Sequence, residues 1–170
     1  MMGAGKTTIG RRLARRLGRP FLDSDQQIEA RTGRTVREIF EADGEDAFRI
    51  IETDVLGEAL DTTAPSVVAA AGGAVLREVN RTRMRDAGTV VWLRADPSVL
   101  ADRVRSGVHR PLLADDPARV LHDLDAARRA LYEEVADHVV DTEGRPPEEV
   151  VDQLVALVHR PERPSERETR

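Results

Sequence analysis

The chain has 170 residues, of which 31 are acidic and 26 basic, and its formal net charge is -5. This length allows one domain with a sizeable core, and the acidic balance argues against a general nucleic-acid-binding protein, which usually carries a basic face. The sequence has no cysteine, so thiolate chemistry is excluded, and no apolar run approaches the roughly 18 residues of a membrane span. Because no signal peptide is recognisable, we expect a cytoplasmic protein without a membrane partner.

Predicted helices and strands alternate along the chain. In the first half we expect a helix over residues 9–17, a short strand over 20–25, a helical stretch over 25–60 that breaks at Gly33 and near Gly44, and, within 66–75, a buried strand that runs into a glycine turn. In the second half we expect a helix over 78–87, a strand over 89–93, helices over 96–106 and 118–136 with a loop between them, a strand over 138–142 and a helix over 146–158. This alternation predicts an α/β fold with a parallel sheet.

The domain organisation is simple. We expect a single domain over residues 1–160 and a disordered tail over 161–170, which has no apolar face. Four strands are recognisable, but a phosphate-binding loop normally follows a strand, so a fifth strand is expected before Met1. Without that strand its two neighbours would each show an unpaired apolar edge, and we expect the chain that starts at Met1 to be unstable.

A glycine-rich stretch over residues 2–8 carries the clearest chemical signal. Gly5, Lys6 and Thr7 match the end of the phosphate-binding pattern G-x-x-x-x-G-K-[ST], whose first glycine would lie one residue before the chain begins. Backbone N–H groups from Gly3 onward would bind phosphates, and the Thr7 hydroxyl would bind Mg²⁺. Lys6 is the single lysine among 26 cationic residues, which favours this interpretation over a glycine-rich terminus followed by an ordinary helix.

Two aspartates, Asp23 and Asp25, follow the first predicted strand. Residues two apart on a strand point the same way, so both carboxylates would lie beyond the carboxyl edge of the sheet, where ligands bind in open α/β folds. One could hold Mg²⁺ through water while the other accepts a proton from a substrate hydroxyl. The alternative is that Asp25 caps the next helix.

The middle of the chain adds an arginine–glutamate pair and a glycine pair. Arg49 and Glu52 share one helix face, either as part of a site or as a surface ion pair. Gly72 and Gly73 end a buried strand, where they would let a ligand approach the backbone or form an ordinary turn.

Arginines in and after the loop between the helices are further candidates. Arg110 lies in this loop, which is either a lid over a transferring phosphoryl group or an ordinary surface loop. Arg128 and Arg129 lie on the following helix, where one is expected to face the ligand and the other to be solvated.

Taken together and in this order, these motifs resemble the shikimate kinase family. The resemblance runs from Met1 to about Val158 and is densest at the stretches MGAGKTTIGRRLA, LDSDQQIE, GRTVREIFEADGEDAFR, GGAV, RPLL, ALYEEVAD and VVDTEGRPPEEVV. It implies a P-loop kinase-type parallel sheet of five strands in the order 2-3-1-4-5, flanked by helices and covered by a lid loop, with the first strand missing here. It also implies a monomer that uses ATP and Mg²⁺ to phosphorylate shikimate to shikimate 3-phosphate, in chorismate biosynthesis.

The resemblance further implies a role for each matching residue. The catalytic residues would be Lys6, Asp25 and Arg110; the ATP-binding residues Gly3, Ala4, Gly5, Lys6, Thr7, Thr8, Arg110 and Arg145; the shikimate-binding residues Asp25, Arg49, Gly72, Gly73 and Arg128; and the magnesium-binding residues Thr7 and Asp23. Glu52 would orient the substrate arginines, and Arg103 or Arg105 would cover the second face of the adenine.

The sequence also departs from the family pattern. Ala71 stands where a third glycine is usual, and Ala130 where a proline is common; we expect both to be tolerated. Two other interpretations remain at this point: another small P-loop kinase, acting on gluconate or a nucleoside monophosphate, or an inactive nucleotide-binding relic that lacks its N-terminal strand.

Overall fold

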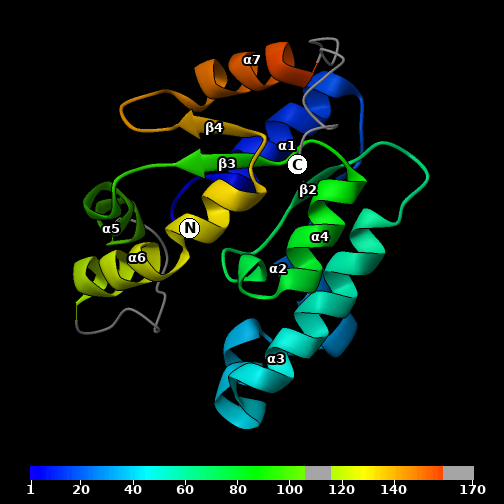
Figure 1. Ribbon diagram of the computed structural model, residues 1–170, viewed down its shortest axis with the longest axis vertical. Helices are drawn as coiled ribbons and strands as arrows, with labels where there is room; N and C mark the ends of the chain where they lie inside the picture. Colours follow the sequence, from blue (N-terminus) through cyan, green and yellow to red (C-terminus); the bar gives the residue numbers. More distant parts are fainter. Residues whose placement is uncertain (106–115, 159–170) are drawn as a thin grey trace.

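Short parallel strands lie between layers of helices in the computed structural model, which describes residues 1–105 and 116–158 (Figure 1). The strands are β1 (Phe21–Asp23), β2 (Val67–Ala69), β3 (Val91–Arg94) and β4 (His138–Asp141). The helices are α1 (Lys6–Leu17), α2 (Ser24–Thr32), α3 (Val36–Leu60), α4 (Glu78–Ala87), α5 (Pro97–Arg105), α6 (Pro117–Val135) and α7 (Pro147–Val158), with a 3₁₀ helix, η1 (Ala74–Leu76). The predicted α/β class is confirmed.

Local chemistry sets the ends of the helices. Gly18 ends α1 in a left-handed conformation, with φ of 62°, which a residue without a Cβ adopts at little cost. Thr35 begins α3 with a capping box, in which its hydroxyl and the Glu38 side chain bond each other's backbone N–H groups. Gly44 has φ of 83° and kinks α3 where the sequence predicts a break.

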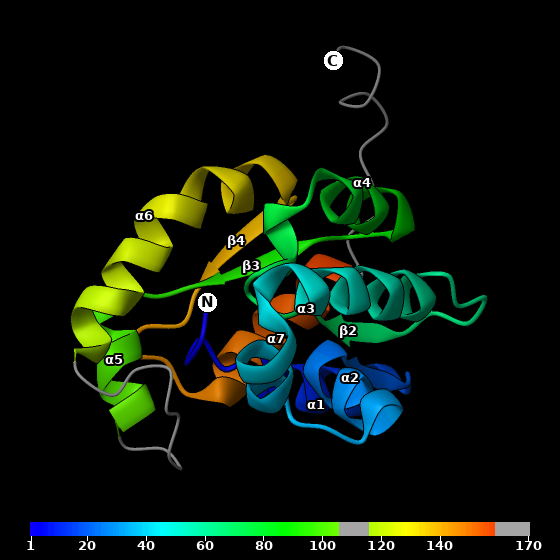
Figure 2. The same ribbon diagram turned by 90° about the horizontal axis from the view of Figure 1, so that it is seen from below.

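The strands form two separate parallel pairs. β1 pairs with β2, with Phe21 opposite Val67, and β3 pairs with β4, with Val91 opposite His138. Figure 2 draws β3 and β4 side by side and β2 apart from them. In the family's order 2-3-1-4-5, strand 1 is the one missing here, so β1 and β2 correspond to the family's strands 2 and 3, and β3 and β4 to its strands 4 and 5. The two observed pairs are therefore the neighbours expected from this order.

Apolar clusters fill both faces of the strands. On one face, α1 and α7 bury Ile9, Leu13, Val150 and Leu154 against β4. On the other face, helices α3, α4 and α6 pack around Trp92 of β3, contributing Leu56, Met84, Tyr132 and Val135. A third cluster, of Ile28, Ile39, Phe48 and Val55, lies within α2 and α3. Burial of these apolar side chains therefore holds in place the helices and strands that carry the site.

Two predicted boundaries are wrong. The first strand ends at Asp23, and Asp25 lies in the first turn of α2, because the Asp23 side chain accepts a hydrogen bond from Gln26 N and caps that helix. The second strand ends at Ala69, because the Ala71 N–H donates to the Ser24 hydroxyl at 2.9 Å and the chain then turns at Gly72. In residues 1–105 and 116–158, no helix is both long and apolar enough to cross a membrane.

Candidate active site

The predicted phosphate loop precedes α1 and has the backbone that its glycines allow. Gly3 and Gly5 have φ of 76° and 85°, a region that side chains disfavour, and Ala4 between them is buried. A Cβ on Gly3 would also lie 3.1 Å from the Leu100 carbonyl oxygen. Lys6 begins the helix, so backbone N–H groups and the positive helix end face the same space, which is the arrangement that binds anions.

Lys6 and its neighbours differ in where they point. The Lys6 Nζ donates to the Met1 carbonyl oxygen at 2.9 Å, which holds the ammonium against the loop. Thr8 is exposed. Thr7 turns the other way, and its hydroxyl donates to Asp23 Oδ2 at 2.8 Å.

The contact between Thr7 and Asp23 joins the two residues predicted to hold Mg²⁺. A hydroxyl and a carboxylate are oxygen ligands of the kind that Mg²⁺ prefers, and this ion usually takes only one or two protein ligands, with phosphates and water completing the shell. The described residues contain no cluster of three or more His, Cys, Asp or Glu side chains that could form an all-protein metal site. The donors present fit a magnesium ion that is bound together with a nucleotide.

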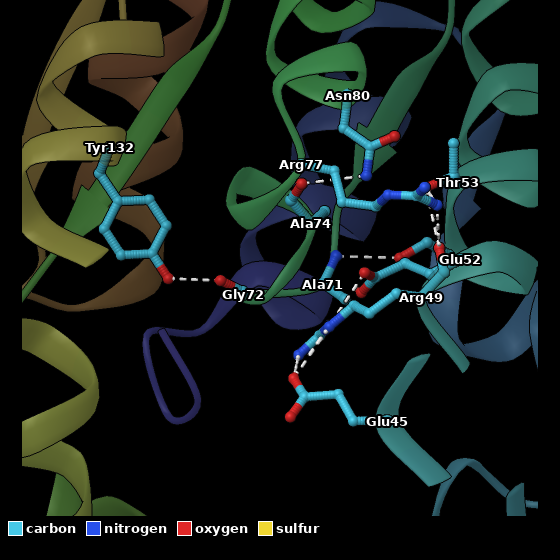
Figure 3. A network of polar contacts seen from close by, with 11 residues as sticks. Glu45, Arg49, Glu52, Thr53, Ala71, Gly72, Ala74, Arg77, Asn80 and Tyr132 are labelled. Atoms are coloured by element: carbon cyan, nitrogen blue, oxygen red, sulfur yellow. Dashed lines mark hydrogen bonds and ion pairs between the residues drawn. The ribbon is translucent and has the colours of Figure 1, made fainter. Parts of the chain in front are cut away.

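Arg49 lies at the centre of a polar network between α3 and the Gly72–Gly73 turn (Figure 3). Its guanidinium donates to Glu52 Oε2 at 2.8 Å and to Glu45 Oε1 at 2.8 Å, and only 13% of its side chain is exposed. A Cβ on Gly73 would overlap the Arg49 guanidinium. A side chain at Gly73 would therefore have to displace the Arg49 guanidinium from its place over this backbone.

Glu52 is fully buried below this arginine. Burial raises the pKa of its carboxyl, while the hydrogen bond from Arg49 and the charges of Arg49 and Arg128 oppose that shift and the charge of Asp25 adds to it. Its second oxygen, Oε1, has no hydrogen-bond partner among the described residues. The charges of Asp25 and Arg128 thus act on the same carboxyl that Arg49 binds.

Arg128 extends from α6, the helix whose Tyr132 bonds the Gly72 carbonyl. Its charge and a side-chain hydrogen bond lower the pKa of Tyr132, one helical turn away, against the larger effect of burial, which raises it. Its charge also acts on the Met1 amine. Two guanidinium groups on separate helices, with a backbone turn between them, can bind a carboxylate by charge-assisted hydrogen bonds.

Three side chains that the sequence did not identify as functional hold this turn. Tyr132 donates to the Gly72 carbonyl at 2.6 Å, Ser24 accepts from Ala71 N, and Asn80 donates to the Ala74 carbonyl at 3.0 Å (Figure 3). Tyr132 also stacks on Trp92, with 5.4 Å between the ring centroids. The only sequence signal was the spacing of Tyr132 four residues after Arg128, which is equally typical of a core tyrosine.

Arginines near the phosphate loop and α7 lie at the other end of the site. Arg103 donates to the Thr142 carbonyl at 2.6 Å and to the Gly3 carbonyl at 3.4 Å, so it bridges the phosphate loop and the segment after β4. Arg145 follows in that segment and donates to the Asp141 carbonyl and to Gln153. Arg105 pairs with Asp102 on the surface.

Arg129 is not part of this arrangement. Arg129 pairs with Asp125 through its Nε at 3.0 Å and lies over the Trp92 ring, and 42% of its side chain is exposed, so it is partly solvated as expected for one of the two arginines. Arg110 lies outside the described residues.

Comparisons with known proteins identify the family. The family model described as shikimate kinase matches residues 2–159. The chain is 50% identical to a shikimate kinase of Ralstonia nicotianae, over 93% of this chain and 81% of the relative, and 47% identical to one of Symbiobacterium thermophilum, over 91% and 90%. It is similar to the solved structure of an Acinetobacter baumannii shikimate kinase in complex with shikimate, with a TM-score of 0.87 and 40% identity over 92% of this chain and 88% of that one. The chain belongs to the shikimate kinase family.

Proposed function

We propose that this protein transfers the γ-phosphoryl group of ATP to the 3-hydroxyl of shikimate. The observation that carries the proposal is that Arg49 lies over the Gly73 backbone while α6, the helix that carries Arg128, is bonded to Gly72 through Tyr132, in a chain that belongs to a family of kinases. These arginines would bind the shikimate carboxylate, and Glu52 would hold Arg49 in place.

The phosphate end of the reaction rests on the loop before α1. Backbone N–H groups of Gly3, Ala4, Gly5, Thr7 and Thr8 would bind the ATP phosphates, and the Lys6 ammonium would leave the Met1 carbonyl for the β- and γ-phosphates. Thr7 and Asp23 would hold Mg²⁺, Asp23 through water; the ion neutralises charge on the phosphates when it is bound. Arg103 and Arg145 would cover the adenine.

The chemical step is an in-line displacement. The substrate hydroxyl oxygen attacks the γ-phosphorus, the bond to the bridging oxygen breaks, and ADP takes the bonding electron pair. Asp25, at the start of α2, would accept the hydroxyl proton. Arg110, proposed from the sequence pattern alone, would neutralise charge on the transferring group. We further propose a cytoplasmic monomer whose ligands are ATP and shikimate rather than a nucleic acid or a membrane.

An acceptor comparison tests this function. ADP release is measured with Mg²⁺ and ATP in the presence of shikimate, gluconate or CMP, and the product is identified by mass. The expected result is turnover with shikimate and none with the other two acceptors. A folded protein that binds ATP but shows no shikimate-dependent ADP release would overturn the proposal, and preference for gluconate or CMP would replace it.

A further inference from the structure

Two glutamates share the guanidinium of Arg49, and they differ in how firmly the protein holds them. Glu52 Oε2 accepts from Nη1 at 2.8 Å, and the Glu52 side chain is fully buried. Glu45 Oε1 accepts from Nε at 3.2 Å and from Nη2 at 2.8 Å, but 58% of the Glu45 side chain is exposed (Figure 3). Glu52 is therefore a fixed partner of this arginine, whereas Glu45 can exchange it for water at little cost.

The position of Arg49 leaves one edge of its guanidinium for a carboxylate. A guanidinium can bind a carboxylate with two parallel hydrogen bonds along its Nη1–Nη2 edge or along its Nε–Nη2 edge. The Nη1–Nη2 edge of Arg49 lies against the glycine turn, because a Cβ on Gly73 would overlap both nitrogens. The Nε–Nη2 edge carries Glu45. A substrate carboxylate that binds Arg49 with two hydrogen bonds therefore meets Glu45 on the edge that the turn leaves open.

Charge makes the two carboxylates exclusive on this edge. Both would lie within hydrogen-bond distance of the same two nitrogens, and like charges this close repel each other. Arg49 itself keeps a carboxylate partner in either arrangement, which matters because only 13% of its side chain is exposed. A largely buried guanidinium without a partner would be costly, so an exchange of one carboxylate for another is favoured over simple loss of Glu45.

The chain next to Glu45 is not held in regular helix. Gly44, directly before it, has φ of 83° and ψ of 174° and kinks α3, and a Cβ on Gly44 would meet no heavy atom within 4 Å. Glu45 therefore lies at the start of the part of α3 that follows the kink, one helical turn before Arg49, with open space beside it.

We propose that Glu45 sets the affinity of the site for the substrate carboxylate, because its own carboxylate competes for the Nε–Nη2 edge of Arg49 and is displaced when the substrate binds there. The inference rests on the proposed function, in which Arg49 binds the shikimate carboxylate. It gives Glu45 a role opposite to that of Glu52: Glu52 holds the arginine in place, and Glu45 opposes binding.

Shikimate binding by calorimetry, without ATP, tests the proposal on the full chain. Glu45→Gln keeps the length of the side chain and one oxygen acceptor but removes the charge. Glu41→Gln is the matched control, because Glu41 lies one turn earlier on α3, is 59% exposed and pairs with Arg37 at 2.6 Å in the same i, i+4 arrangement. The Tm of each variant shows that it is folded.

Glu45→Gln is expected to lower the Kd for shikimate about two- to fivefold, the effect of removing one exposed ion pair that competes with the ligand. Glu41→Gln should leave the Kd unchanged. In the Arg49→Ala background, Glu45→Gln should have no effect, because the edge for which the two carboxylates compete is gone. Methyl shikimate, whose ester carries no charge, should bind Glu45→Gln and the unmodified chain equally.

A Kd for Glu45→Gln equal to or above that of the unmodified chain would overturn the proposal, since Glu45 would then hold Arg49 in place as Glu52 does. An equal decrease in Glu41→Gln would also overturn it, because the effect would then come from net charge alone. Because ATP is left out, a chain that binds shikimate in this way but transfers no phosphoryl group would contradict the proposed function and not this inference. Absence of shikimate binding in every form would overturn both.

Discussion

The Tyr132 hydroxyl donates a 2.6 Å hydrogen bond to the Gly72 carbonyl and so ties the helix that carries Arg128 to the turn that lies under Arg49. This bond thereby fixes the helices of Arg49 and Arg128, the two arginines proposed to bind the substrate carboxylate, relative to each other. The two residues are 79 residues apart in the sequence. The spacing between them therefore depends on the Tyr132 phenol.

Replacing Tyr132 with Phe is expected to raise the KM for shikimate about two- to twelvefold, the effect of losing one neutral hydrogen bond, and to leave the KM for ATP unchanged. The ring would still stack on Trp92, so the Tm should change little. Steady-state kinetics with each substrate varied in turn measure the effect. Arg119→Ala, at an exposed position of the same helix, is the control. A Tyr132→Phe enzyme with unchanged kinetics would mean that the turn holds its place without this bond.

Arg49→Ala and Arg128→Ala are each expected to raise the KM for shikimate roughly ten- to hundredfold, because a charge-assisted hydrogen bond is worth about 1.5–3 kcal/mol. The KM for ATP should stay nearly constant. Arg129→Ala, which removes the neighbouring guanidinium paired with Asp125, serves as the matched control and should affect shikimate much less. Equal increases in both KM values would place these arginines at the nucleotide instead.

Gly73→Ala places a methyl group where the Arg49 guanidinium lies, so the arginine must move and shikimate affinity should fall. A double-mutant cycle separates this cause from a general disturbance of the turn. In the Arg49→Ala background, Gly73→Ala should add little further loss, because the side chain that it displaces is gone. Additive losses would show that the glycine acts through the backbone alone.

Lys6→Arg keeps the charge but should abolish most turnover, because a planar guanidinium does not fit the tight loop that holds a compact ammonium. The measurement is kcat at saturating ATP and shikimate, with ATP binding by calorimetry to show that the variant is folded. Near-normal turnover would mean that either cation serves and that the single lysine is a coincidence of composition.

The Met1 amine predicts a pH dependence of stability with a definite sign. Its pKa is about 4 when folded and 8.0 in the reference state, so between these values the unfolded chain binds a proton that the folded chain does not. Stability from this group is fully present above pH 8 and is lost as the pH falls toward 4, by about 1.4 kcal/mol per pH unit within that range.

Urea unfolding from pH 4 to 8, compared between the 170-residue chain and its Nα-acetylated form, isolates this contribution, since all other groups are shared. The free energy of unfolding of the acetylated chain should lack the part of the pH dependence that comes from the Met1 amine. Identical pH profiles would show that the amine is solvated in the folded protein.

Sequence reasoning predicted the helices well because the residues that begin, end or kink them act locally. Gly18, Gly33 and Gly44 mark an end or a kink in the structure as they do in the sequence. It failed at the cap of α2, because the Asp23 carboxylate caps this helix two residues before Asp25, the cap that the sequence offered.

The site was only partly predictable for a similar reason. Arg49, Arg128 and the glycine pair follow a recognisable order, whereas Tyr132, Ser24 and Asn80 act through contacts between distant elements. No spacing rule links Ala71 to Ser24, 47 residues earlier; that contact exists because β1 and β2 pair and end at the same edge.

The position of Lys6 against the Met1 carbonyl has a practical consequence for chemical labelling. The chain contains one lysine, and this residue, Lys6, lies in the phosphate loop. An amine-reactive acylating reagent therefore has one lysine side chain to modify, and the mass increment on the peptide that contains Lys6 reports the accessibility of this loop. The protein carries, by its composition, a selective chemical reporter of nucleotide occupancy that requires no engineered cysteine or fluorescent group.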